Sequence, residues 1–319
     1  MLGPLNSVSQ FLNSCRFFLG VLGVLGVLGV LGGSAFSVCA QPIAVADDRG
    51  KQVALAAPAQ RIVALAPSLA ELAFAAGAGG RLVGVARYSD FPPAARKLPQ
   101  VGDAARVDFE RVVVLKPDLI WAWKSGNSAA DVSRLESLGY PAFVSEPARL
   151  GDIPRLLHAI GTLAGTLPVA GKAAAEFERE ITALRGRYAK AHTVRVFYQI
   201  WHRPLLTVNG AHMISDVIAL CGGENVFADV SQLTPSVTLE AVIAAKPEMI
   251  LGGGSAGGEK EFAAQWRASS VPPLRELPAH YINPDHIQRQ TPRIVEGAKA
   301  VCAALEEVRR NRQEKHKNN

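Results

Sequence analysis

The chain has 319 residues, which is enough for one large domain or two domains of ordinary size. Its formal net charge is +6, but five basic residues and Glu314 between positions 309 and 317 supply a net +4 of that charge. The remaining body is therefore close to neutral. It has no stripe of Lys and Arg interleaved with aromatic residues, which excludes nucleic acid as the expected partner.

The N-terminal residues have the pattern of a secretory signal. Residues 17–40 are apolar and carry no charge, Arg16 precedes them, and Val38-Cys39-Ala40 fits a cleavage site. A retained transmembrane helix is an alternative, because the stretch approaches the roughly 20 residues that span a bilayer. Its Gly-Val-Leu repeat disfavours that alternative, since glycine is a poor helix former. Lipidation of Cys39 is a second alternative, disfavoured by Val38 before it. We expect residues 1–40 to be a cleaved signal peptide.

Strands and helices alternate after this segment. Residues 61–65 have the β-branched character of a strand, Pro67 and Ser68 open a helix over residues 69–76, and residues 82–85 form another strand. Strands that alternate with helices predict a parallel sheet.

An internal repeat predicts two lobes of similar plan. Residues 107–120 recur as residues 237–250, an offset of 130. Both copies contain apolar residues at helical spacing, a Lys-Pro pair that ends the helix, and an apolar run typical of a buried strand. The shared apolar positions are Phe109, Val112 and Val113 in the first copy and Leu239, Val242 and Ile243 in the second. One supersecondary unit repeated at this spacing indicates a duplicated architecture.

A long amphipathic helix separates the two copies. Phe177, Ile181, Leu184 and Tyr188 recur at helical spacing, and a strand at residues 194–198 and a helix at residues 213–220 then open the second lobe. The predicted fold class is α/β, with two Rossmann-like lobes of parallel sheets, a single connecting helix and a ligand cleft between the lobes. The predicted organisation is a signal peptide at 1–40, an N-terminal lobe at 41–166, a connecting helix at 167–191, a C-terminal lobe at 192–310 and a basic flexible tail at 311–319.

Export makes the remaining cysteines disulfide candidates. Once the signal is removed, Cys221 and Cys302 remain as an even pair. A bridge would close a loop of 81 residue steps and stabilise the fold by about 4 kcal/mol in the chain-entropy model. Two unrelated buried thiols are the alternative.

Residues that follow strands are the candidates for ligand contact, because open α/β sheets bind ligands at the carboxyl ends of their strands. These residues are Tyr88, Trp123, Trp201 and the segment from Asp285 to Arg289. Aromatic rings at loop positions suit a large amphipathic ligand that covers them, with Asp285 or Arg289 on its polar rim. For a tryptophan of the 121–123 strand, a place in the core is the alternative, and for Asp285 and Arg289 it is a surface ion pair.

Motifs for catalysis are weak or missing. Residues 252–257 satisfy G-x-G-x-x-G, but Glu259-Lys260-Glu261 stand where an apolar helix should begin. The chain contains no H-E-x-x-H. His280, Asp285 and His286 lack a third spaced histidine for a metal site. A nucleotide-dependent or metal-dependent enzyme is therefore the less favoured alternative, and we expect no catalysis, no cofactor and no resident metal.

Five segments together resemble a known family. They are residues 61–77, Tyr88-Ser89-Asp90-Phe91-Pro92-Pro93, Leu115-Lys116-Pro117-Asp118-Leu119, Cys221-Gly222-Gly223-Glu224-Asn225 and Pro292-Arg293-Ile294. More specific are the Tyr88 segment, residues 122–127 and residues 285–289. The chain resembles the periplasmic cobalamin-binding components of ABC importers over residues 60–308. These belong to the helical-backbone class of solute-binding proteins, which also take up haem and ferric siderophores.

The resemblance implies a role for each candidate residue. Ser68, Tyr88 and Trp123 are expected on the first-lobe side of the cleft, and Asp285, His286, Ile287, Gln288 and Arg289 on the second-lobe side. Glu110 and Glu240, the equivalent acids of the repeat, are expected to dock on arginines of an inner-membrane ABC permease. Stabilisation of a helix N-terminus is their plainer role. The resemblance also implies a Cys221–Cys302 disulfide, a periplasmic location and a monomer when free.

Two departures from the family bear on the ligand. Ala104-Ala105-Arg106 and Thr234 stand where the family has further tryptophans. Trp201 and Tyr198 are the expected replacements. Cobalamin is therefore the expected transported ligand, and haem or a ferric siderophore is the alternative.

Overall fold

The computed structural model describes residues 43–103, 106–253 and 258–317. The predicted signal peptide at 1–40 and its alternatives at Cys39 lie outside the described residues. So do Ala104 and Ala105 and the glycine-rich residues 254–257.

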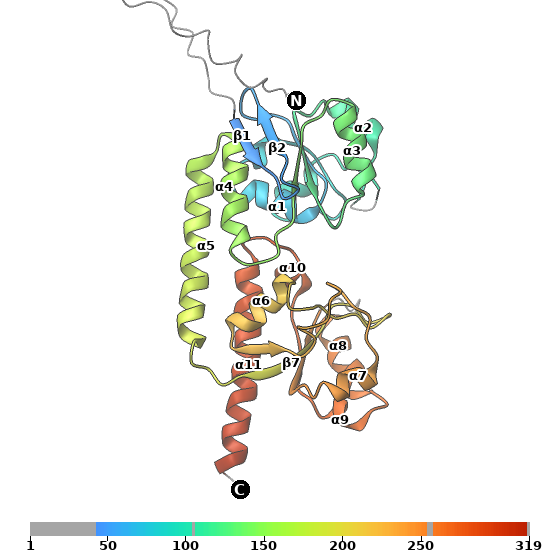
Figure 1. Ribbon diagram of the computed structural model, residues 1–319, viewed down its shortest axis with the longest axis vertical. Helices are drawn as coiled ribbons and strands as arrows, with labels where there is room; N and C mark the ends of the chain where they lie inside the picture. Colours follow the sequence, from blue (N-terminus) through green and yellow to red (C-terminus); the bar gives the residue numbers. More distant parts are fainter. Residues whose placement is uncertain (1–42, 104–105, 254–257, 318–319) are drawn as a thin grey trace, which may run out of the picture. The chain divides into compact units, whose positions relative to one another are not determined.

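The first lobe is built on a four-stranded parallel sheet (Figure 1). Its strands are β3 (Ile62–Ala64), β4 (Leu82–Val85), β5 (Leu119–Trp123) and β6 (Ala142–Ser145), in the order β4-β3-β5-β6. Apolar side chains cover both faces, which is typical of a parallel sheet between helices. The helices are α1 (Pro67–Ala75), α2 (Phe109–Leu115), α3 (Ala129–Ser137) and α4 (Asp152–Ala164), with short turns η1 (Gly79–Arg81) and η2 (Pro93–Lys97). Strands β1 (Ile43–Ala46) and β2 (Gln52–Leu55) form a separate antiparallel hairpin.

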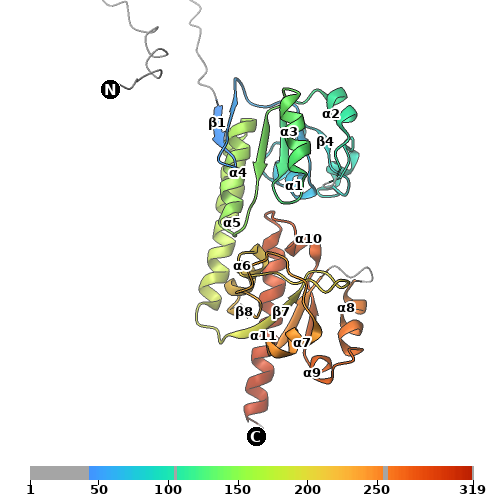
Figure 2. The same cartoon turned by 45° about the vertical axis from the view of Figure 1, so that its right-hand side comes forward.

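The second lobe repeats this strand order. Its strands are β7 (Val194–Gln199), β8 (Gly223–Asn225), β9 (Met249–Gly252) and β10 (Ala279–Tyr281), in the order β8-β7-β9-β10. The helices are α6 (Met213–Leu220), α7 (Leu239–Ala244), α8 (Gly258–Arg267), α9 (Pro272–Arg275), α10 (Pro284–Ile287) and α11 (Ile294–Lys317). Figure 2 shows α7, α8 and α9 on one side of β7 and α6 on the other. Two parallel-sheet α/β lobes are therefore confirmed, as the repeat predicted.

The repeated Lys-Pro motif has the same local structure in both lobes. Lys116 and Lys246 adopt left-handed φ angles of 46° and 47° after α2 and α7. An arginine closes each helix end: Arg61 donates to the carbonyls of residues 115 and 116, and Arg195 donates to those of 245 and 246. The backbone N–H of each arginine donates a hydrogen bond to a carboxylate, that of Asp118 in the first lobe and that of Glu248 in the second. The repeat therefore preserves a set of helix-end contacts as well as a hydrophobic pattern.

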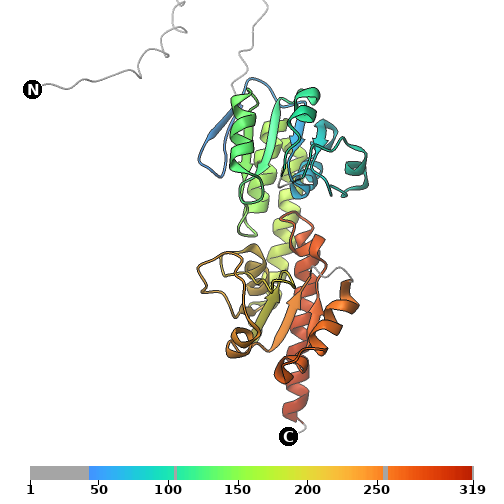
Figure 3. The same cartoon turned by 90° about the vertical axis from the view of Figure 1, so that its right-hand side faces the viewer.

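The connecting segment is one continuous helix, α5 (Leu167–Tyr188). Its buried side chains include Phe177, Ile181 and Tyr188, which is the apolar face predicted from the spacing. The helix packs on α4 and α1 of the first lobe and on α6 and α11 of the second (Figure 3). Within the described residues, no helix is both long enough and apolar enough to cross a membrane.

The flexible tail predicted from residue 311 is wrong for its described part, because α11 extends to Lys317. Side-chain contacts hold this extension. Arg309 is buried and donates to the carbonyls of His192, Cys221 and Gly222. One turn later, Arg312 pairs with Glu248. Arg309 and Arg312 therefore anchor the C-terminal helix to the second lobe.

The predicted disulfide between Cys221 and Cys302 is present, with an S–S distance of 2.01 Å. It joins the C-cap of α6 to the middle of α11, and both residues are buried. The bridge therefore ties the last helix to the start of the second lobe.

Candidate functional site

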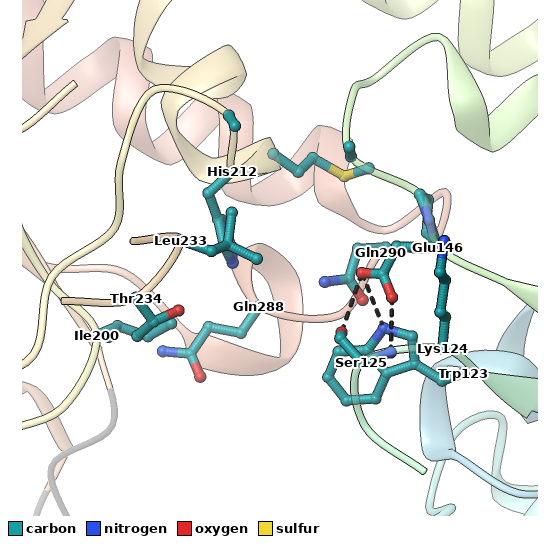
Figure 4. A pocket seen from close by; sticks show the side chains of 14 residues that line it. Trp123, Lys124, Ser125, Glu146, Ile200, His212, Leu233, Thr234, Gln288 and Gln290 are labelled. Carbon is teal, nitrogen blue, oxygen red and sulfur yellow. Dashed lines mark hydrogen bonds between the residues drawn. The ribbon is translucent and has the colours of Figure 1, made fainter. Parts of the chain in front are cut away.

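A cavity of about 610 Å³ is lined by residues from both lobes (Figure 4). The first lobe contributes the last residue of β5 and residues that follow β5 and β6, and the second contributes residues that follow β7, lie at the start of α6, follow β8 or follow α10. The lining residues are Trp123, Lys124, Ser125, Glu146, Pro147, Ala148, Ile200, Ala211, His212, Met213, Leu233, Thr234, Gln288 and Gln290. This volume lies in the range of small-molecule sites, roughly 300–1,000 Å³.

Trp123 is the aromatic ring of this cavity lining, and its loop fixes the orientation of the ring. The residue ends β5, and its backbone N–H donates to Oδ1 of Asn127 at 2.7 Å. Gly126 lies against the indole, since a Cβ atom there would come within 1.8 Å of Cε3 of the ring. Trp121, two residues earlier, is fully buried and packs edge-on against Phe143. Of the two tryptophans in this strand, Trp121 therefore belongs to the core and Trp123 to the cavity.

Glu146 organises the first-lobe wall, although the sequence analysis did not single it out. Its carboxylate accepts hydrogen bonds from the backbone N–H of Ser125 at 2.7 Å and from the Ser125 hydroxyl at 3.0 Å. The indole Nε1 of Trp123 donates to the same carboxylate at 3.4 Å, and these three bonds are drawn as dashed lines in Figure 4. Glu146 directly follows β6, so the rule that selected Trp123 after β5 was also a signal for Glu146.

The second-lobe wall consists of aliphatic side chains and uncharged polar groups. His212 is the N-cap of α6, and its Nδ1 accepts the backbone N–H of Ile214 at 3.1 Å. Burial lowers the pKa of His212 to about 4, so the imidazole is neutral near pH 7. The wall also contains Gln288 and Gln290. His212 and Gln290 were not anticipated, although His212 stands at the start of a predicted helix.

The structure places two of the predicted ligand-binding residues, Trp123 and Gln288, on the cavity lining. Ser68 is half-buried in the first turn of α1. Tyr88 is 70% exposed with a φ of 67°, and Trp201 is 51% exposed with its Nε1 donating to the carbonyl of Arg203. These three residues are not part of the cavity lining in the described structure, and their contact with a ligand remains a prediction.

The prediction that Tyr198 takes the place of one of the missing tryptophans in the cleft is wrong. Tyr198 is fully buried in the second-lobe core, because its side chain points from β7 into the layer shared with α6 and α11. Thr234, which stands where the family has a tryptophan, does line the cavity. The second-lobe wall therefore lacks a ring at this position.

Arg289 joins the lobes through ion pairs with first-lobe carboxylates. Its Nη1 lies 2.6 Å from Oε1 of Glu71 and 2.7 Å from Oδ1 of Asp90. Its Nη2 lies 2.9 Å from Oδ1 of Asp285, so the predicted pair of Asp285 and Arg289 is an ion pair. Burial lowers the pKa of Arg289, but the Glu71 and Asp90 carboxylates outweigh it, and the net shift is upward.

Glu71 is the centre of this interlobe cluster. Besides Arg289, it accepts hydrogen bonds from Nη2 of Arg293 at 2.7 Å, Nε of Arg293 at 2.9 Å and the hydroxyl of Thr291 at 3.1 Å. The guanidinium of Arg293 also lies 3.8 Å from the centre of the Phe91 ring. Two further residues that were predicted to contact the ligand come just before Arg289 in the sequence. Ile287 is buried in the core, and His286 is half-buried.

Glu110 and Glu240 occupy equivalent exposed positions in the first turns of α2 and α7. Asp108 and Thr238 cap these helices by accepting the backbone N–H three residues later. Hydrogen bonds from its own backbone N–H and from Thr238 lower the pKa of Glu240. Both positions suit helix stabilisation and leave the acids accessible to a partner.

Among the described residues, no group of three or more His, Cys, Asp or Glu side chains is placed to hold a metal ion. The glycine-rich residues 254–257 of the weak dinucleotide motif are not described.

The family model for periplasmic binding proteins matches residues 62–279. The vitamin B12-binding protein of Vibrio parahaemolyticus is 36% identical to this chain over 255 residues, which cover 80% of this chain and 92% of that protein. The crystal structure of the periplasmic vitamin B12-binding protein BtuF of Vibrio cholerae matches with a TM-score of 0.70 and 35% identity, covering 79% of this chain and 98% of that chain. The haem-binding protein RhuT of Roseiflexus sp. RS-1 shares the fold, with a TM-score of 0.69 at 22% identity, covering 78% and 98% of the two chains. The chain belongs to the periplasmic binding protein family.

Proposed function

We propose that this protein binds cobalamin in the periplasm and delivers it to an ABC permease, without catalysing a reaction. The observation that carries the proposal is the cavity shared by the two lobes, with Trp123 on one wall and uncharged polar groups on the other. The vitamin B12-binding names of relatives at 35–36% identity support cobalamin as the ligand. Removal of residues 1–40 as a signal peptide completes the proposal.

The chemistry of the walls suits a corrin. An indole ring gives a flat apolar surface for the macrocycle, and Ile200, Met213 and Leu233 add aliphatic contacts. The corrin rim carries carboxamides, which pair with neutral donors and acceptors such as the Gln288 and Gln290 amides. Haemin, with two carboxylates, is the competing ligand; the second-lobe wall offers its carboxylates no cation, and Lys124 lies on the first-lobe wall with Glu146.

Calorimetric titration of the mature protein with cyanocobalamin and with haemin tests this proposal. We expect a dissociation constant for cyanocobalamin below about 1 µM, which corresponds to about 8 kcal/mol. The W123A variant should bind at least about 30-fold more weakly, the effect typical of an aromatic hot spot. Leu138→Ala, at an exposed position outside the cavity lining, is the control and should leave binding unchanged. Preference for haemin, or equal effects of the two substitutions, would contradict the assignment.

We propose that Glu110 and Glu240 form the docking surface for the permease. Two exposed acids at equivalent positions of a duplicated structure suit a partner with two equivalent basic sites, since complementary charges fix the register of docking. The E110A/E240A double variant should bind cyanocobalamin normally but fail to support cobalamin uptake by cells. Substitution of the exposed Glu178 on α5 is the control. Normal uptake by the double variant would refute the docking role.

A further inference from the structure

One ring nitrogen of His212 accepts a hydrogen bond from the backbone, and the other is free to bind a ligand in the cavity. Nδ1 accepts the backbone N–H of Ile214 at 3.1 Å, so it presents a lone pair to that group and carries no proton. The proton of the neutral ring is therefore on Nε2. Within the described residues, Nε2 makes no hydrogen bond, and His212 belongs to the cavity lining. The second-lobe wall thus contains an N–H donor without a protein acceptor.

The fold also keeps this imidazole uncharged. Protonation would place an N–H on Nδ1 directly against the Ile214 N–H. It would also add a positive charge at the N-terminus of α6, where the helix dipole is already positive. The low pKa that burial gives His212 agrees with this geometry. Nε2–H is therefore a donor at every pH at which the protein is expected to work.

The surrounding groups define what this donor can recognise. On the second-lobe wall, the polar neighbours are the Gln288 and Gln290 amides and the Thr234 hydroxyl, all of them uncharged. On the first-lobe wall, the Lys124 ammonium group donates to the carbonyl of Asp48, while Glu146 supplies a negative charge. A carboxylate bound at His212 would find no cation on the second-lobe wall, since Lys124, the cation of the lining, lies on the first-lobe wall with Glu146. The carbonyl oxygen of an uncharged carboxamide satisfies the donor without needing a cation.

We propose that His212 is a specificity-determining residue, whose neutral Nε2–H donates to a carboxamide carbonyl on the rim of the bound macrocycle. This inference rests on the proposed cobalamin function. It assigns His212 to the recognition of an amide and excludes it as an axial ligand of the metal. Axial ligation through Nε2 would move the ring proton to Nδ1 and break the cap of α6.

Two substitutions separate the cap from the donor, because each amide side chain mimics one nitrogen of the imidazole. In His212→Asn, the side-chain oxygen can take the place of Nδ1, so the cap is kept and the distal donor is lost. In His212→Gln, the side-chain nitrogen can take the place of Nε2, so the donor is kept and the cap is lost. At pH 7 we expect H212N to melt like the unmodified protein and to bind cyanocobalamin about fivefold more weakly, the effect of one neutral hydrogen bond. H212Q should melt at a lower temperature but bind within about twofold of the unmodified protein.

Calorimetry, melting curves and the visible spectrum of bound aquocobalamin together decide the outcome. Equal affinity of H212N and the unmodified protein, or equal losses in H212N and H212Q, would overturn the donor role while leaving cobalamin binding intact. A His212-dependent shift of the aquocobalamin absorption bands would overturn it in favour of axial ligation. Failure of the unmodified protein to bind cyanocobalamin at all would overturn both this inference and the proposed function.

Discussion

Replacing Glu71 by Gln should destabilise the protein far more than loss of an ordinary surface carboxylate. The Glu71 side chain is 3% exposed and accepts four hydrogen bonds, from Arg289, Thr291 and both Nε and Nη2 of Arg293. Glutamine keeps the size of the side chain and removes its charge. Arg289 keeps Asp90 and Asp285 as partners, whereas Arg293 loses its ion-pair partner and keeps the Phe91 ring and the neutral hydrogen bond that the glutamine oxygen can accept.

The expected loss of stability comes from the positive charge of Arg293, which E71Q leaves without an ion-pair partner. Breaking a fully buried ion pair typically costs about 3–5 kcal/mol. The Arg293 side chain is 21% exposed, so water compensates part of the loss, and we expect about 2–3 kcal/mol for E71Q. A coupling energy of about 2 kcal/mol between E71Q and R293Q should appear in a double-mutant cycle.

Urea unfolding of E71Q, R293Q and the double variant measures these free energies. The control is E180Q, which removes an exposed partner of Lys299 at 3.1 Å, with side chains that are 42% and 46% exposed. This control should cost no more than about 1 kcal/mol. If E71Q costs no more than E180Q, the interlobe cluster does not contribute to stability as the burial and contacts indicate.

Three further outcomes are expected. Replacing Cys221 and Cys302 together by Ala should lower the free energy of unfolding by about 4 kcal/mol in a denaturant titration, because the bridge spans 81 residues. The Gly126→Ala substitution should weaken cyanocobalamin binding in calorimetry about tenfold, since a Cβ atom would displace the indole; Gly186→Ala, at a glycine with open space around it, is the control. Because folding lowers the pKa of His212 to about 4 from an ordinary 6.5, the free energy of unfolding should keep its full value above pH 6.5. It should decrease by up to about 3 kcal/mol as the pH falls toward 4, and melting curves of H212N should lack this pH dependence.

The lobes were predictable because their signals are local. Each copy of the helix, Lys-Pro and strand unit carries its own hydrophobic spacing and helix end, and the structure realises these as α2 with β5 and as α7 with β9. The left-handed Lys116 and Lys246 explain why a helix stops there in both copies. The contacts at these helix ends involve residues that are neighbours in the sequence, or an arginine on the adjacent strand.

The site was harder to predict because its partners lie far apart in the sequence. Arg289 was expected to contact the ligand, which stays a prediction; its pairing with Glu71, which lies 218 residues earlier, was not foreseen. No local pattern reports such a pair. Tyr198 was placed in the cleft, yet its position on the inner face of β7 puts it in the core. Glu146 and His212 were not predicted, because neither has an aromatic ring typical of a macrocycle contact nor belongs to a motif, although Glu146 follows β6 and His212 begins α6.

Among the described residues, two of the connections between the lobes are expected to limit how far the cavity opens. One is the uninterrupted helix α5, and the other is the cluster of ion pairs around Glu71. A helix resists bending, and the ion pairs resist separation, so the mouth of the cavity does not widen freely. We therefore expect the ligand to enter through a preformed opening, and its release to depend on forces that a partner protein supplies.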